Sequence, residues 1–403
     1  MNIDPHKYQR KELELKALLE ITQAINENQP ESVLAEIFKF TCLVHLNIKS
    51  LVLYVAKEDD FEMKIQHGVK SSLPDLILAS QINDEKSSGE LRLALDGAYS
   101  FKELETYLPV YHKSRILAIL FLKRKNPDLE LDLDFTQALS NILVVALENK
   151  RFARKQVEQE VLNREVAIAS KVQQMLFPAS LPNTKEIKAK VTYFPHSLVG
   201  GDYYDLVLKS EEEIYFCIAD VSGKGISAAL LMSNFQATLR TLLRSNADMK
   251  TIVNQLNYTL FENTKGERFI TFFLGCYNPK KGVLSYINAG HNAPLLCREK
   301  ENICEELHAG TTILGAFEEL PFLEIGSREN LSAFSIHLYT DGVTEAMNDR
   351  EEEYGEERFF AFVQNNFKVD PEEFHQLFMN EIEGFTGKIP LRDDLTLLSL
   401  RFD

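Results

Sequence analysis

Five short acidic motifs in the C-terminal half of this 403-residue chain constrain its fold more than any other feature. Four of them place an aspartate at the end of an apolar, strand-like run or at the start of one. A carboxylate in such a position is held rigidly at the rim of a sheet. The motifs cover residues 200–205, 219–225, 288–292, 339–342 and 393–396.

Carboxylates that converge from separate strands repel one another unless a cation lies between them. No matching set of histidine or cysteine ligands accompanies these aspartates, and oxygen ligands alone favour Mg²⁺ or Mn²⁺ over zinc. The chemistry that suits such a site is metal-assisted attack of water on a phosphate ester.

The order and wording of the motifs resemble the metal-dependent protein serine/threonine phosphatases of the type 2C superfamily. The resemblance is closest to the bacterial sporulation-stage-II-E and sigma-regulator branch, and it covers residues 165–403. It includes residues 167–178, which look like the segment that precedes the phosphatase domain in that branch. It implies an α-β-β-α sandwich, in which two sheets are flanked by helix layers.

Asp220 is the first candidate site residue. It follows an apolar run and opens a loop with Gly223 and Gly225, where the backbone can approach a ligand closely. The resemblance implies that Asp220 bridges two metal ions, Mn²⁺ or Mg²⁺, and that the carbonyl of Val221 is a further ligand. It also makes Asp341 a ligand of the first metal. Asp220 and Asp341 are the predicted catalytic residues.

Two other motifs each contain two candidate ligands. By resemblance, Asp393 aligns with the C-terminal metal aspartate and is preferred over Asp394. Asp202 and Asp205 both remain candidates for the second metal's shell, with Asp202 the first choice. An odd separation places the two on opposite faces of an extended segment, although Gly200 and Gly201 suggest a turn or bulge there.

Histidine, serine and lysine residues near these motifs leave further options. His291 is either a general acid or a loop histidine that fixes strand geometry together with Asn288 and Asn292. Ser222 and Lys224 suggest a phosphate-cradling loop, but the glycine spacing is not that of a P-loop. No arginine is placed by sequence to bind a phosphate, so the substrate-binding residues stay unknown.

The resemblance also implies a mechanism and a partner. Two ions share a water that attacks a phosphoserine or phosphothreonine in line, without a covalent phosphoenzyme. In the bacterial branch the substrate is usually a phosphorylated anti-sigma-factor antagonist, a STAS-domain protein (an anti-anti-sigma factor). The alternative function is a catalytically silent signalling scaffold with the same fold.

Bulk properties exclude some other functions. The formal net charge of −16 and the lack of a basic block argue against nonspecific binding to nucleic acid or anionic membranes. The apolar runs are too short to cross a bilayer, and the N-terminus has no signal-peptide core. The five cysteines are odd in number, scattered and without CxxC spacing, which predicts reduced thiols in a cytoplasmic protein.

The length predicts more than one domain, and the predicted class is α+β. Residues 1–150 show helices, then strands, then a long helix, a pattern that resembles a GAF-type sensor domain. A structural or dimerising α+β domain without a ligand is the alternative. Residues 151–178 predict a signalling helix linker, and residues 179–403 the phosphatase domain.

Apolar residues in the linker helix recur at heptad spacing, as at Val161, Ile168 and Met175. This spacing favours a short parallel coiled coil, with a single amphipathic helix as the alternative. We therefore expect a homodimer through the N-terminal domain and the linker.

The apolar patterns also predict individual elements. Helices are expected over residues 7–26, 31–46, 135–152, 226–243, 247–262, 356–367 and 371–384. Strands are expected over residues 49–56, 61–67, 114–123, 187–194, 213–219, 270–277, 283–288, 334–339 and 395–401, paired in antiparallel sheets.

Overall fold

The computed structural model describes residues 5–58, 60–78, 103–112, 115–129, 131–245 and 247–403. The chain divides into two compact units, Met1–Glu160 and Val161–Asp403. The predicted helix at 135–152 and the predicted linker helix form one continuous element, α3 (Leu133–Gln174). The division between the two units falls inside this helix. No glycine or proline interrupts it. Ser114, the first residue of one predicted strand, lies outside the described residues. In the described part of the chain, no helix combines the length and apolar character that a membrane span requires.

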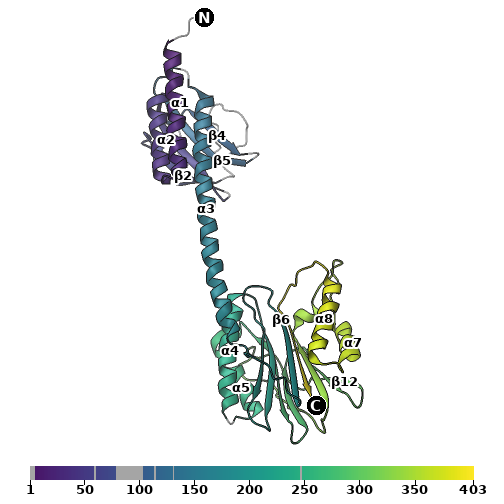
Figure 1. The fold of residues 1–403 in the computed structure, drawn as a ribbon. Helices are drawn as coiled ribbons and strands as arrows, with labels where there is room; N and C mark the ends of the chain where they lie inside the picture. Colours follow the sequence, from purple (N-terminus) through teal and green to yellow (C-terminus); the bar gives the residue numbers. More distant parts are fainter. Residues whose placement is uncertain (1–4, 59, 79–102, 113–114, 130, 246) are drawn as a thin grey trace. The chain divides into compact units, whose positions relative to one another are not determined.

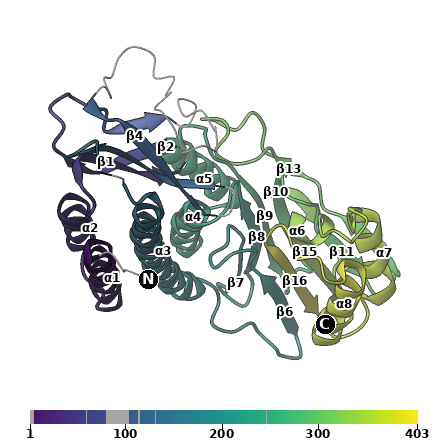
Figure 2. The ribbon, with the colours of Figure 1, turned by 90° about the horizontal axis from the view of Figure 1, so that it is seen from above.

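The N-terminal unit packs helices on one face of an antiparallel sheet with strand order β3-β2-β1-β5-β4 (Figure 2). Helices α1 (Pro5–Asn26) and α2 (Glu31–His45) and the beginning of α3 share one buried core with that face. The strands are β1 (Ile48–Lys57), β2 (Asp60–His67), β3 (Leu76–Leu78), β4 (Thr106–His112) and β5 (Arg115–Arg124).

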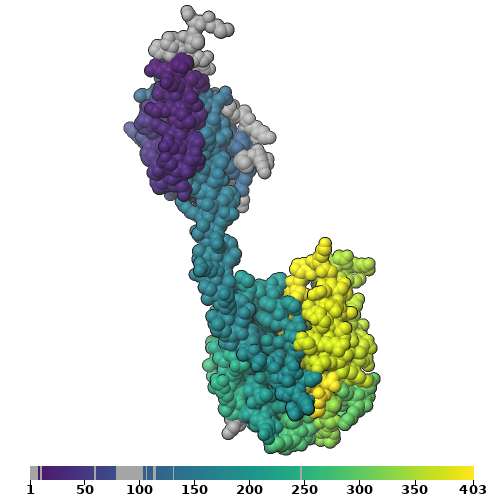
Figure 3. All heavy atoms as spheres, in the orientation of Figure 1, coloured from purple at the N-terminus to yellow at the C-terminus, as the bar shows by residue number. Residues whose placement is uncertain are grey.

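Strand β1 has apolar side chains on both faces, and both faces are buried. Leu51 and Leu53 belong to the core under the helices, whereas Val52 and Tyr54 belong to a separate cluster on the opposite face. The order of helices, strands and closing helix is the one expected from the sequence. The outer side of α1 carries exposed leucines such as Leu15, and its surface is seen in Figure 3.

In the described part of the C-terminal unit, the strands form two facing sheets. The first has the order β13-β10-β9-β8-β7, with β14 also paired to β10, and the second has the order β12-β11-β15-β16-β6. Among the described residues, the strand pairs of these sheets are antiparallel except β10 with β13. The first sheet contains β7 (Tyr203–Leu208), β8 (Ile214–Val221), β9 (Ile270–Asn278), β10 (Val283–Ala289), β13 (Gly310–Thr311) and β14 (Gly326–Arg328). The second contains β6 (Ile187–Phe194), β11 (Leu295–Arg298), β12 (Ile303–Glu306), β15 (Phe334–Tyr339) and β16 (Leu395–Phe402).

Helices cover the outer faces of this pair of sheets (Figure 1). Helices α4 (Ile226–Arg244) and α5 (Met249–Thr264) lie on the first sheet, and α7 (Glu356–Asn366) and α8 (Pro371–Thr386) on the second. Between the sheets, the rings of Tyr277, Phe334 and Phe402 pack against one another with centroids 4.7–5.0 Å apart. This is the predicted α-β-β-α arrangement.

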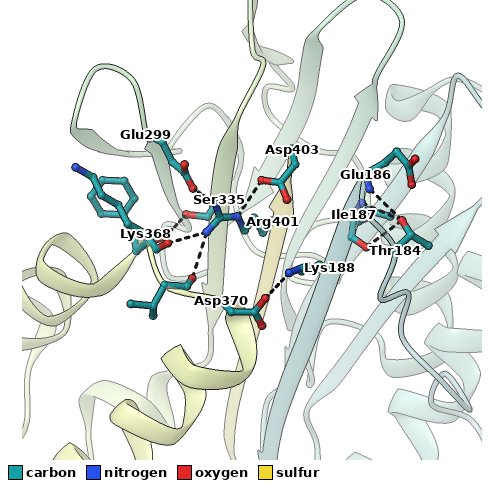
Figure 4. A network of polar contacts seen from close by, with 12 residues as sticks. Thr184, Glu186, Ile187, Lys188, Glu299, Ser335, Lys368, Asp370, Arg401 and Asp403 are labelled. Carbon is teal, nitrogen blue, oxygen red and sulfur yellow. Dashed lines mark hydrogen bonds and ion pairs between the residues drawn. The ribbon is translucent and has the colours of Figure 1, made fainter.

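A polar network ties the α7–α8 connection to the second sheet (Figure 4). The Arg401 guanidinium donates to the carbonyl of Lys368 at 2.7 Å and to the Asp403 carboxylate at 3.0 Å. The Lys188 ammonium of β6 lies 2.5 Å from Asp370, the N-cap of α8. These contacts hold the end of β16 that is opposite to the acidic motif preceding the strand.

The prediction that all cysteines are reduced is wrong for two of them. Cys297 of β11 and Cys304 of β12 are directly paired across the antiparallel ladder, with Cα atoms 4.1 Å apart, and form a disulfide. Cys42, Cys217 and Cys276 are free. The sequence spacing hid this pair, because a separation of seven residues brings two side chains together only once the hairpin register is known.

Candidate metal centre

Topology brings the predicted acids to one end of the two sheets. In the first sheet, Asp202 directly precedes β7 and Asp220 lies near the end of its antiparallel neighbour β8. In the second sheet, Asp341 follows β15, and Asp393 and Asp394 precede its antiparallel neighbour β16. Because the start of one strand lies beside the end of its antiparallel partner, four separate segments meet at a common rim.

Asp202 is the most deeply buried of these acids, with 1% of its surface exposed. Its Oδ2 accepts hydrogen bonds from the hydroxyl of Thr340, at 2.8 Å, and from the hydroxyl of Thr396. Burial raises the pKa of Asp202 well above its ordinary value, and the nearby charge of Asp220 raises it further. Two hydroxyl donors therefore orient this carboxylate, which forms no ion pair within the described part of the chain.

Asp220 lies among the other carboxylates. Burial raises the pKa of Asp220 to about 7, with further contributions from Asp341, Asp393 and Asp394 in that order. The pKa of Asp341 is also raised, first by burial and then by Asp393, although the backbone N–H of Gly342 opposes the shift. Mutual repulsion of this kind is relieved by a bound divalent cation.

The adjacent residues Asp393 and Asp394 have different partners. The Asp394 carboxylate accepts backbone N–H groups from His196 at 2.7 Å and from Gly201 at 2.6 Å, which fixes the loop of the first motif. The Asp393 carboxylate instead lies 2.7 Å from the ammonium of Lys224. Asp394 therefore fixes the backbone at His196 and Gly201, whereas Asp393 pairs with the Lys224 ammonium.

Two glycines, Gly201 and Gly342, let the segments that carry the acids approach one another closely. A Cβ atom at Gly201 would lie 3.0 Å from the carbonyl oxygen of Val221 and 3.6 Å from Oδ1 of Asp220. A Cβ atom at Gly342 would lie 2.0 Å from the carbonyl oxygen of Asp394. Side chains at these two positions would push apart the segments that carry the acids.

Asp205 lies apart from this group, on β7 beneath helix α4. Arg240 of α4 donates to both of its carboxylate oxygens, at 2.8 and 3.0 Å, and the hydroxyl of Tyr203 donates to Oδ2 at 2.6 Å. The structure thus brings Asp202, and not Asp205, to the rim with the other acids. Asp205 anchors a helix to its sheet.

His291 is buried, and both of its ring nitrogens have partners. Nε2 lies 3.0 Å from the carbonyl oxygen of Tyr339, which requires it to donate, and Nδ1 lies 2.8 Å from the hydroxyl of Thr271. Burial lowers the pKa of His291 to about 4. The geometry favours the structural interpretation, since the ring joins β9 of one sheet to β15 of the other.

Sequence reasoning missed three residues around this rim. Glu345, whose raised pKa is due first to partial burial and then to Asp341, follows Asp341 by four residues, a spacing that places both on one side of a helical turn. Lys224 was considered only as part of a phosphate loop. The Arg268 guanidinium donates to the carbonyl of Ser222 at 3.1 Å, a contact that no local pattern predicts.

The donor chemistry fits a hard divalent cation, because the acids offer only oxygen and burial with mutual repulsion raises the pKa of Asp202, Asp220 and Asp341. Within the described ranges, however, no group of three or more His, Cys, Asp or Glu side chains has a ready ligand geometry. Oxygens of Asp202 and Asp394 already accept hydrogen bonds, and Asp393 pairs with Lys224. Of these three carboxylates, only that of Asp393 is paired with a positively charged side chain among the residues that the structure describes.

Comparisons with known proteins match the C-terminal part of the chain. Residues 210–403 match the family model of Stage II sporulation protein E (SpoIIE). The phosphoserine phosphatase RsbU of Bacillus subtilis (strain 168) is 30% identical over 191 residues, which cover 47% of this chain and 56% of RsbU. The phosphoserine phosphatase RsbP of the same organism is 27% identical over 184 residues, 45% of either chain. This chain thus spans about half the length of the curated relatives it matches.

A solved structure shows the same fold. The SiaA-PP2C domain of Pseudomonas aeruginosa superposes with a TM-score of 0.54 at 19% identity, covering 61% of this chain and 99% of that domain. This likeness shows the fold of the C-terminal unit. By sequence, residues 210–403 are similar to the SpoIIE family, and the chain is similar to two phosphoserine phosphatases.

Proposed function

We propose that this protein is a metal-dependent phosphatase that hydrolyses phosphoserine or phosphothreonine on a partner protein. One observation carries the proposal: four separate segments bring carboxylates to one rim, where burial and neighbouring acids raise the pKa of Asp220 to about 7. The names of the relatives RsbU and RsbP support a phosphoserine substrate.

The proposed ligands for two Mn²⁺ or Mg²⁺ ions are Asp202, Asp220, Asp341, Asp393 and the carbonyl of Val221. When bound, the ions supply Lewis acidity that activates water for in-line attack and neutralises the phosphoryl oxygens. Thr340 and Thr396 orient Asp202 through their hydroxyls, and His291 holds the strand that leads to Asp341. Asp394 supports the first-motif loop, and Asp205 has no direct role at the metals.

The test is phosphate release by the full chain from an aryl phosphate monoester and from a phosphoserine protein, with Mn²⁺ and with chelator. We expect Asp220→Asn to lower turnover by about 10²–10³-fold, because transition-state charge stabilisation is lost. Asp349→Asn, an exposed turn position, is the matched control and should retain activity. Full turnover by Asp220→Asn, or turnover that survives chelation, would exclude this function.

The proposed substrate is a phosphorylated STAS-domain anti-sigma-factor antagonist, as the motif resemblance implies. The net charge of −16 favours recognition through specific contacts over general attraction of an anionic phosphoprotein. A panel of purified phosphorylated STAS proteins from the same genome tests this part. Rates on every STAS protein equal to those on an unrelated phosphoserine protein would contradict it.

We further propose that residues 1–150, as a GAF-like domain, control a cytoplasmic homodimer through the linker helix. Exposed apolar side chains along α3, including Val161, Ile168 and Val172, support a helix–helix contact between two copies. Ile168→Glu should convert the dimer to monomer in light scattering, whereas Lys171→Glu on the same helix should not. Truncation before Ala167 should change turnover severalfold if the N-terminal domain controls the site.

A further inference from the structure

Lys224 supplies the metal rim with a positive charge from the chain itself. It lies between Gly223 and Gly225 in the loop joining β8 to α4, immediately beyond Asp220 and Val221. Its Nζ is 2.7 Å from Oδ2 of Asp393 and donates to the carbonyl of Arg392 at 2.5 Å. The side chain reaches across from the first sheet to the strand start of the second.

This charge acts on the outer half of the acidic group. Besides pairing with Asp393, Lys224 counteracts the raised pKa of Asp341 and of Glu345. The pKa of Asp202 and of Asp220 is governed chiefly by burial and then by other carboxylates. The rim has a buried inner part around Asp202, which is 1% exposed, and an outer part at Asp393, whose side chain is 29% exposed and pairs with Lys224.

The loop that carries Lys224 has a glycine with positive φ on each side of the lysine. Gly223 and Gly225 have φ angles of +98° and +74°, values that a side-chain-bearing residue rarely adopts. A Cβ atom at Gly225 would meet nothing within 4 Å, so this side of the loop faces open space. The Lys224 side chain is half exposed, at 52%, so part of it already faces solvent.

We propose that Lys224 is an internal counter-ion that occupies the outer half of the metal centre and competes with a divalent ion for Asp393. The inference rests on the proposed metal-dependent function. An ammonium and a dication at the same carboxylate oxygen would repel each other, so binding of the outer ion requires Lys224 to leave Asp393. Lys224 is thus a positioning residue that sets the affinity of the outer ion below that of the inner one.

The test is calorimetric titration of the full chain with Mn²⁺ alone, which reads binding without any substrate. We expect Lys224→Met to tighten the weaker Mn²⁺ affinity by about tenfold, because a half-exposed competing charge is removed. Lys224→Arg keeps the charge and should keep the wild-type affinity. Lys188→Met removes a comparable ion pair, with Asp370 at 2.5 Å, and should leave Mn²⁺ binding unchanged.

A second measurement needs no variant. In the wild-type protein, Mn²⁺ should release the Lys224 amine from Asp393 and raise its rate of chemical acylation severalfold, as read by peptide mass spectrometry, while Lys188 stays unchanged. Mn²⁺ binding that is unaffected or weakened by Lys224→Met, or an acylation rate that Mn²⁺ leaves unchanged, overturns the inference. If neither the wild type nor Lys224→Met binds Mn²⁺, the proposed function fails together with it.

Discussion

Gln173, near the end of α3, holds the backbone of Gly200 through both ends of its side-chain amide. Its Nε2 donates to the carbonyl oxygen at 2.7 Å, and its Oε1 accepts the N–H at 3.2 Å. Gly200 begins the motif that contains Asp202. The last turn of the long helix is therefore bonded directly to the loop that presents a proposed metal ligand.

Gln173→Ala should lower both the Mn²⁺ affinity and the stability of the protein. The substitution leaves the buried polar backbone groups of Gly200 without partners, at a cost of about 1–3 kcal/mol in the free energy of unfolding. We expect a severalfold fall in Mn²⁺ affinity, measured by calorimetry, together with the loss of stability in urea. The neighbouring exposed Gln174→Ala is the control, and equal effects of the two substitutions would contradict a specific role for Gln173.

Asp202 and Asp205 should respond to substitution with opposite signs in the absence of metal. Asp202→Asn removes a buried negative charge that repels Asp220, so the unfolding free energy should stay constant or rise. Asp205→Asn breaks the bidentate contact with Arg240 and should cost about 2–3 kcal/mol. Mn²⁺ affinity should fall for Asp202→Asn and not for Asp205→Asn. Denaturation in chelator and Mn²⁺ titration of both variants check these signs.

Buried histidines should make the C-terminal domain sensitive to acid. Burial lowers the pKa of both His337 and His375 to about 3. The unfolded chain, with an imidazole pKa near 6.5, binds more protons between about pH 6.5 and pH 3, so each residue contributes stability that is lost as pH falls through this window. The loss is at most about 1.4 kcal/mol per pH unit for each histidine.

The raised pKa of Asp220 acts in the opposite direction, because its folded-state proton stabilises the metal-free protein below about pH 7. Subtracting the unfolding free energy of His337→Gln from that of the wild type cancels the Asp220 contribution and leaves that of the histidine. The gap in unfolding free energy between wild type and His337→Gln should shrink from pH 7 to pH 5 in chelator. A gap independent of pH would contradict the buried neutral state, and His67→Gln at an exposed position is the control.

The cross-strand disulfide gives a simple count. Denatured without reductant, the protein should expose three thiols, since Cys297 and Cys304 are bonded and Cys42, Cys217 and Cys276 are free. After reduction, thiol titration should give five. Cys304→Ser should give four under both conditions, because its former partner becomes free. Five thiols in the unreduced wild-type protein would show that the pair is open.

Long apolar runs predicted most of the C-terminal fold, because strands such as β15 and β16 are buried throughout and need no tertiary information to be recognised. Strand β7 was missed. It follows two glycines, and its polar residue Asp205 is buried only because Arg240 reaches it from another element. Short edge strands such as β12 carry too few apolar residues to give a pattern.

The acidic rim was predictable as a group but not in its details. Motif order indicated that acids from distant segments belong together. The sequence does not show which oxygen of Asp394 accepts the Gly201 amide or that Asp393 pairs with Lys224. Both contacts depend on how the two sheets pack. Such contacts join residues far apart in sequence, and no local spacing encodes them.

The contacts of His291 between the two sheets have a consequence for the acidic rim. Like charges at the rim push the two layers of strands apart, and this load falls on whatever fastens one layer to the other. The neutral His291 ring contacts Thr271 of the first sheet and Tyr339 of the second, so it links the two sheets without adding charge to the rim. The two sheets can therefore stay together at the rim despite the repulsion between their carboxylates.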